Sequence, residues 1–158
     1  KITGGIQCAD GDHLEKYEGD GTMRWEKVKL GDIIDTLKGY AFKSTHYVDE
    51  GIGIVRASNF TLDSIDDTDL KYYSFEEASQ FEKYKLECGD VLIQTVGSWE
   101  SNPNSVVGKV VIVPQNLHGA LLNQNIVKLF PKNKTKLNQK YLYYRLKCND
   151  FKKYFCYN

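Results

Sequence analysis

The sequence predicts an α+β fold: a mostly antiparallel β-sheet core with short helices and a C-terminal helix. Short runs of β-branched and apolar residues are separated by Gly, Pro and Asp turns, and strands do not alternate regularly with long helices. The length of 158 residues suits one domain, and 41% hydrophobic with 27% charged residues is typical of a folded globular protein. No run approaches the roughly 18 apolar residues of a membrane span.

The N-terminal part predicts a lead-in followed by a strand and a short helix. Residues 1–24 are rich in Gly and Asp and lack an apolar period, so we expect an irregular lead-in or linker there. Residues 28–30 alternate as a short strand. Asp32 can then cap a short helix over 33–38 that ends at Gly39.

The middle of the chain predicts two strands around one helix. Residues 52–57 form an apolar run, whereas residues 61–71 are acidic and irregular. The tetrapeptide Ser74-Phe75-Glu76-Glu77 matches a capping box and predicts a helix over about 75–83. Residues 91–95 then predict a β-branched strand.

The C-terminal part predicts two further strands and the longest helix. A polar loop over 97–108 leads into a strand over 109–113, and residues 126–130 form the next strand. Each of these strands is followed by a proline, which cannot continue a ladder. Asn138 can cap a helix from 139 to about 155.

Cysteine usage argues against a metal centre. The four cysteines at positions 8, 88, 148 and 156 form no Cys-x-x-Cys pair, and the three histidines are scattered. We therefore expect neither a structural zinc site nor a cofactor. The N-terminus carries no export signal, so we expect reduced thiols and a cytoplasmic location.

Motifs of the common catalytic classes are absent. The sequence has no GxxxxGK[ST] phosphate loop, no GxGxxG dinucleotide turn and no GxSxG nucleophile elbow. It also lacks an Asp-Pro-Pro-Tyr-type segment, which an amino-methyltransferase needs to grip a flipped base. His46 and His118 could each serve as the base of a small hydrolase, but no nucleophile can be assigned to either, and structural histidines are the alternative.

The net charge of zero conceals two parts of opposite sign. Residues 1–100 hold 11 Lys and Arg against 20 Asp and Glu, a net −9, whereas residues 101–158 hold 10 against 1, a net +9. A basic zone attracts phosphate, and the same charges can instead pair with the acidic part across the fold. From charge alone, both interpretations stay open.

Two polar segments are candidates for hydrogen bonding to nucleic-acid bases. Arg56, Ser58 and Asn59 follow a predicted strand, and Arg and Asn are the side chains whose paired groups match guanine and adenine edges. The segment 94–104 is rich in neutral amides and hydroxyls, which can discriminate hydrogen-bonding patterns, although an ordinary polar turn has the same composition. The lysines within 132–140 suit either phosphate contact or a solvated loop.

Taken together, these segments resemble the target recognition domain of type I restriction-modification specificity (S) subunits. The resemblance begins at 25–33, Trp-Glu-Lys-Val-Lys-Leu-Gly-Asp-Ile, and extends over about 25–155 in order and spacing. Its further pieces are Gly39-Tyr40-Ala41-Phe42-Lys43-Ser44, Ile54-Val55-Arg56-Ala57-Ser58-Asn59-Phe60, Leu86-Glu87-Cys88-Gly89-Asp90-Val91-Leu92-Ile93, Gly108-Lys109-Val110, Leu121-Leu122-Asn123-Gln124-Asn125-Ile126 and Tyr141-Leu142-Tyr143-Tyr144-Arg145-Leu146.

The resemblance implies a non-catalytic DNA reader without a cofactor, occupying residues 25–158. Such a domain recognises one half of a split double-stranded target and directs adenine-N6 methyltransferase subunits and a restriction subunit to it. Since there is one recognition domain rather than two, we expect a fragment cut before a spacer helix, a half-subunit that dimerises, or the recognition end of a fused type II restriction-methyltransferase. A protein–protein interaction module built on the Tyr-rich C-terminal helix is the alternative that needs no DNA.

The polar positions attached to this scaffold are the expected DNA contacts. Base contacts are expected after the first helix, after the second strand and in the long loop, while Lys109 and the lysine run position the DNA backbone. The set is Lys43, Ser44, Arg56, Ser58, Asn59, Gln94, Thr95, Ser98, Asn102, Asn104, Lys109, Lys132, Lys134 and Lys136.

Overall fold

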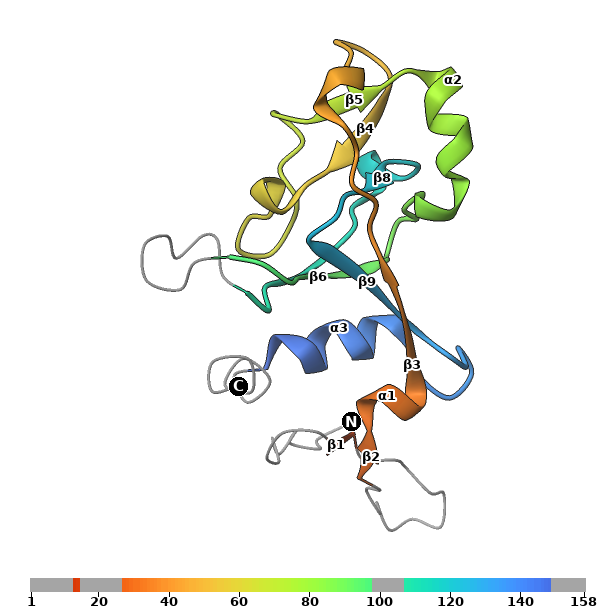
Figure 1. Ribbon diagram of the computed structural model, residues 1–158. Coiled ribbons are helices and arrows are strands. Elements are labelled where there is room, and N and C mark those ends of the chain that lie inside the picture. The colour runs from red at the N-terminus through yellow and green to blue at the C-terminus, as the bar shows by residue number, and fades with distance from the viewer. Residues whose placement is uncertain (1–12, 15–26, 98–106, 149–158) are drawn as a thin grey trace.

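A four-stranded antiparallel sheet lies at the centre of the molecule (Figure 1). The computed structural model describes residues 13–14, 27–97 and 107–148. The central sheet has the order β3 (Ile34–Lys38), β9 (Ile126–Pro131), β6 (Val91–Gln94) and β7 (Val110–Ile112). Because successive side chains of a strand point to opposite faces, both faces of this apolar sheet are available for packing.

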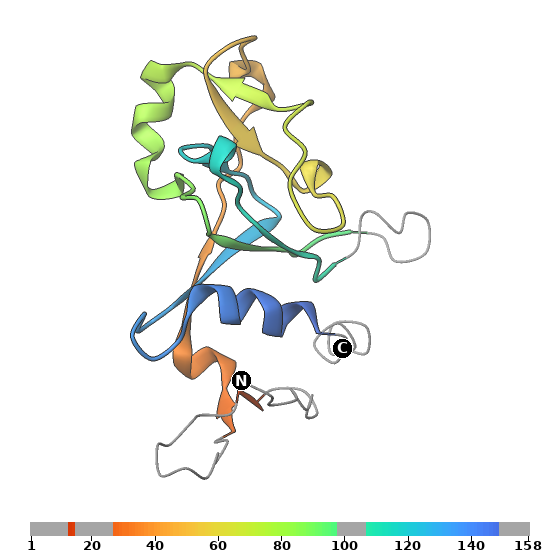
Figure 2. The same cartoon turned by 180° about the vertical axis from the view of Figure 1, so that it is seen from behind.

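The helix α3 (Gln139–Lys147) covers one face of the central sheet. Leu142 and Leu146 are buried with Val91 and Ile93 of β6 on that face. Leu92 of β6 belongs to a second cluster on the other face, between the two sheets. Figures 1 and 2 show from opposite sides that α3 lies across the central sheet on the side away from the second sheet.

The second sheet has three strands in the order β5 (Lys71–Tyr73), β4 (Ile52–Val55) and β8 (Leu121–Leu122). The pair β4–β5 is antiparallel, but β4 and β8 run parallel, with Val55 opposite Leu122. A short antiparallel pair, β1 (His13–Leu14) with β2 (Val28–Lys29), completes the strands of the described chain. The predicted α+β class with a mostly antiparallel sheet is confirmed.

Two predicted helix starts, at residues 75 and 139, are confirmed by side-chain caps. The Ser74 hydroxyl accepts a hydrogen bond from the Glu77 amide at 3.2 Å at the start of α2 (Phe75–Ala78), which continues as the 3₁₀ helix η3 (Ser79–Tyr84). The Asn138 side chain accepts from the amides of Lys140 and Tyr141 at 2.8 and 3.3 Å. The helix α3 ends at Lys147, and Cys148 is already extended, so the helix stops short of the prediction at this residue. The rest of the predicted helix, residues 149–155, lies outside the described residues.

The predicted helix over 33–38 is wrong. Residues Ile34–Lys38 form β3 and pair along their whole length with β9. The preceding turn of helix, α1 (Leu30–Ile33), contains Asp32 rather than being capped by it. The possible cap at Asp32 and the possible end at Gly39 favoured a short helix here, but the ladder to β9 supplies backbone hydrogen bonds that a single helical turn cannot provide.

The remaining elements are short connections. They are the 3₁₀ helices η1 (Ser44–His46), η2 (Ala57–Asn59) and η4 (Gln115–Leu117). The strands β5 and β8 lie in segments for which the sequence predicted no strand, and two residues of the predicted irregular lead-in form β1. No helix within the described residues is long and apolar enough to span a membrane.

Candidate nucleic-acid interface

Three chain segments end side by side at the junction of the two sheets. β4 and β8 are parallel, so the residues that follow them, Arg56 and Asn123, lie at the same edge, and the Asn123 amide donates to the Val55 carbonyl at 3.1 Å. On the other side, Tyr40 forms a parallel bridge with Asn123. Because neighbouring strands are about 4.8 Å apart, the row Arg56–Asn123–Tyr40 spans about 10 Å.

A tight turn joins β8 to β9 directly beside this row. It consists of Asn123, Gln124 and Asn125, and Asn125 has a φ of 69°, in the left-handed region that Asn tolerates. The Asn125 carbonyl accepts a hydrogen bond from the Thr95 amide at 2.9 Å. The turn therefore connects the row to the base of the long β6–β7 connection. Sequence reasoning missed these residues, although a polar triplet between two apolar strands was a usable signal.

Arg56 is held by the acidic segment that follows η2. Its Nη2 donates to the Asp69 carbonyl at 2.6 Å and to Asp69 Oδ2 at 3.1 Å. Lys71 Nζ also lies 3.1 Å from Asp69 Oδ1. The hydrogen bonds from Lys71 and Arg56 hold the pKa of Asp69 below its ordinary value. Asp69 is thus an anion, and it both orients the Arg56 guanidinium and balances its charge.

Asn59 and Gln94 are buried rather than exposed, with 4% and 2% of their surface accessible. The Asn59 side chain accepts from the Arg56 amide at 2.9 Å and donates to the Asp69 carbonyl at 3.2 Å. Gln94 Nε2 donates to the Val96 carbonyl at 2.6 Å. Both amides therefore brace the loops that carry Arg56 and Thr95, and their burial removes these two predicted contacts from the exposed surface.

Lys109 immediately precedes β7, and its side chain reaches Phe60, the residue after η2. Its Nζ is 3.4 Å from the Phe60 carbonyl. Burial, and secondly the nearby Lys147, lower the pKa of Lys109. Ser58 and Thr95 are exposed close by. The structure thus brings Arg56, Ser58, Thr95 and Lys109 into one region, while Ser98, Asn102 and Asn104 lie outside the described residues.

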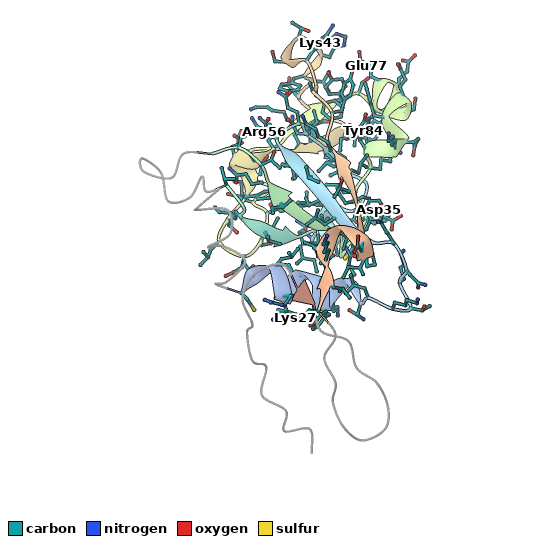
Figure 3. All side chains as sticks on the ribbon, turned by 60° about the horizontal axis from the view of Figure 1, so that its bottom comes forward. Lys27, Asp35, Lys43, Arg56, Glu77 and Tyr84 are labelled. Atoms are coloured by element: carbon teal, nitrogen blue, oxygen red, sulfur yellow. The ribbon has the colours of Figure 1, made fainter. Side chains whose placement is uncertain are left out.

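The other predicted contacts lie elsewhere on the surface. Lys43 and Ser44 are exposed at η1, where the Tyr73 hydroxyl bonds the Lys43 backbone, and Figure 3 shows Lys43 well separated from Arg56. The exposed lysines Lys132, Lys134 and Lys136 follow β9, at the end opposite to Ile126. The five steps from Ile126 to Pro131 put about 17 Å between the turn and these lysines.

Within the described residues, neither of the two histidines singled out in the sequence is hydrogen-bonded to a serine, threonine or cysteine side chain. His46 Nδ1 lies 2.7 Å from Glu77 Oε1, and its ring stacks on Tyr73 with a centroid distance of 6.0 Å. His118 Nδ1 accepts from the Cys88 amide at 3.4 Å. Among the described residues, no group of three or more His, Cys, Asp or Glu side chains could hold a metal ion.

Comparison with known proteins relates the chain to one family. Residues 23–157 match the family described as the type I restriction modification DNA specificity domain. The chain is 29% identical over 143 residues to the putative type I restriction enzyme MjaX specificity subunit of Methanocaldococcus jannaschii, covering 90% of this chain and 32% of that protein. It is 33% identical over 69 residues to the EcoAI specificity subunit of Escherichia coli, covering 44% of this chain and 12% of that protein.

Solved structures show the same fold at low identity. The HsdS subunit from Thermoanaerobacter tengcongensis superposes with a TM-score of 0.57 at 20% identity, over 83% of this chain and 28% of that one. A type I S subunit from M. genitalium gives a TM-score of 0.53 at 16% identity, over 87% of this chain and 30% of that one. The chain spans about a third or less of the length of these relatives. It belongs to the family of type I restriction-modification DNA specificity domains.

Proposed function

We propose that this domain recognises one half of a split double-stranded DNA target and directs methyltransferase and restriction subunits to it. Family membership supports the proposal. The observation that carries it is the alignment of Arg56, Asn123 and Tyr40 at one edge, with Thr95 beside them. Three such segments within about 10 Å fit a B-DNA major groove, which is about 12 Å wide.

The charge around Arg56 favours base contact over phosphate contact. Asp69 lies against the guanidinium, and a carboxylate at that point repels phosphate oxygens. An arginine whose charge is already balanced gains little from a phosphate. The Arg56 Nε is buried, but the Nη donors that are not bonded to Asp69 still match the acceptors O6 and N7 of guanine. Arg56 is therefore the proposed base-reading arginine of this surface.

Phosphate contacts are proposed for the lysine-rich segment after β9. Lys134 and Lys136 are exposed, and the segment starts about 17 Å along β9 from the turn. At 3.4 Å per base pair, that separation corresponds to about five base pairs. One duplex can thus meet the base-reading edge and the lysine segment together. Lys43 and Ser44 stay proposed as further DNA contacts at η1.

Catalysis is assigned to the partner subunits. The proposed partners are adenine-N6 methyltransferase subunits and a restriction subunit in the cytoplasm, with dimerisation if the chain acts as a half-subunit. This division agrees with the names of the relatives, which are specificity subunits.

The experiment measures DNA binding by the full specificity subunit that contains this domain, in complex with its methyltransferase subunits. Duplex binding is followed at two salt concentrations, and methylated sites are mapped by sequencing. Arg56→Ala should alter site choice, and Lys134→Ala should weaken all duplexes alike and lower the salt slope by about 0.9. Lys85→Ala is the control, because Lys85 already pairs with Glu82 on η3. Salt-independent or absent binding by the wild-type complex would refute the proposal.

A second role is supported by exposed aromatic residues on α3. Tyr141 and Tyr144 are 40% and 67% exposed, one turn apart on the helix. Exposed tyrosines are enriched at protein interfaces, so this helix is proposed to contact a protein subunit of the same complex. Tyr144→Ala should then weaken subunit association in the absence of DNA, and unchanged association would exclude this contact.

A further inference from the structure

We propose that Gln124 is a specificity-determining residue whose side-chain amide hydrogen-bonds the edge of one base, with adenine as the matching base. The inference rests on the proposed function and adds a contact that the sequence did not suggest. Gln124 occupies the middle of the β8–β9 turn, and its side chain is exposed. The side chain of Gln124 makes no hydrogen bond with the described part of the chain.

The backbone of this turn is tied down on three sides. The backbone N–H of Gln124 donates to the Tyr40 carbonyl at 2.7 Å, and the backbone N–H of Asn123 donates to the Val55 carbonyl at 3.1 Å. The Thr95 amide donates to the Asn125 carbonyl at 2.9 Å. An exposed side chain on a rigidly held backbone suits recognition, because less conformational entropy is lost when it binds.

The backbones of Gly39 and Asn123 approach each other closely, and this contact holds the turn against the segment that follows β3. A Cβ atom built on Gly39 would lie only 1.9 Å from the Asn123 carbonyl oxygen. The Gly39 amide also donates to the Ile126 carbonyl at 3.0 Å, just after the turn. Only glycine permits this contact, so the position of Gln124 is set by packing and not by a flexible loop.

The chemistry of the amide selects the kind of ligand group. A glutamine side chain carries one acceptor and one donor group side by side, which match N6 and N7 of adenine in the major groove. It has no charge, so a phosphate would gain little from it. The backbone N–H of Asn123 is bonded to the Val55 carbonyl, and Gln124 and Arg56 are the residues that follow these two. Gln124 and Arg56 are therefore close enough to contact neighbouring base pairs.

The test uses the full specificity subunit with its methyltransferase subunits and a pool of duplexes with randomised positions. Bound duplexes are sequenced for the wild type, Gln124→Ala, Gln124→Glu and the control Gln115→Ala. Gln115 is an exposed glutamine on η4, outside the turn. Thermal melting verifies that each variant is folded.

Gln124→Ala should lower the preference at one base position about tenfold and leave the other positions unchanged. Gln124→Glu removes the donor, so the preferred base at that position should shift toward cytosine, whose N4 group donates. Gln115→Ala should match the wild type. Equal weakening on every duplex, with preferences unchanged, would assign Gln124 to the phosphates and overturn the inference. Unchanged binding and preferences would also overturn it, whereas a wild-type complex without any base preference would refute the proposed function itself.

Discussion

Replacing Gly39 by alanine should destabilise the junction of the two sheets. The added Cβ would lie 1.9 Å from the Asn123 carbonyl oxygen, while ordinary contacts begin at 3.4 Å, so the backbones must separate by about 1.5 Å. Three hydrogen bonds cross this junction: Gly39 to Ile126 at 3.0 Å, Tyr40 to Leu122 at 3.0 Å and Gln124 to Tyr40 at 2.7 Å. At about 1 kcal/mol each, their loss amounts to about 3 kcal/mol.

The free energy of unfolding is measured by urea denaturation, with circular dichroism as the signal. Gly31→Ala is the matched control, because a Cβ at Gly31 meets nothing within 4 Å. Its stability should stay the same or rise by up to about 1 kcal/mol. In DNA binding, Gly39→Ala should also reduce base preference at the position assigned to Gln124. Equal unfolding free energies for the two alanine variants would refute the close-approach argument.

Three further predictions concern ion pairs and a helix cap. Asp90→Ala should cost about 3–5 kcal/mol in urea unfolding, because it leaves Lys128 unpaired at 15% side-chain exposure; a loss below about 1 kcal/mol, typical of exposed pairs, would contradict this. Asn138→Ala should lower the stability by about 0.5–2 kcal/mol, seen in thermal melting, and an unchanged melting temperature would show that the cap contributes nothing. The pKa of Asp69 is lower in the folded protein than its ordinary value of 3.8. The ionised carboxylate therefore stabilises the fold at pH values above 3.8, and this contribution is lost as the pH falls through the lower folded pKa. Asp69→Asn should thus be less stable than the wild type near neutral pH and equal to it in strong acid; a constant difference across pH would refute the contact with Arg56.

Local signals in the sequence were sufficient where an element depends on its own neighbours. The capping residues Ser74 and Asn138 start the helices that follow them, since a cap is a contact over two or three residues. The β-branched run at β6 predicted a strand, because fully buried central strands are continuous apolar runs. These elements follow from short-range chemistry.

Elements that depend on distant partners were not predictable in this way. Residues 34–38 became β3 because β9, some ninety residues later, offers a complete ladder. The two-residue strand β8 is held by distant segments, through its parallel pairing with β4 and an antiparallel bridge from Leu121 to Lys85. Likewise, a sequence cannot distinguish the buried bracing amides of Asn59 and Gln94 from the exposed amide of Gln124, since burial is decided by what packs above each one.

The sequence by itself determined the fold class, the capped helices and the kind of protein family, because composition, period and motif order are properties of the chain. Tertiary structure alone decided which polar groups share one edge. Arg56, Asn123 and Tyr40 come from three separate segments, and only the parallel alignment of those segments places them in a row. The physical reason is that backbone hydrogen bonds between strands act across space, independent of distance along the chain.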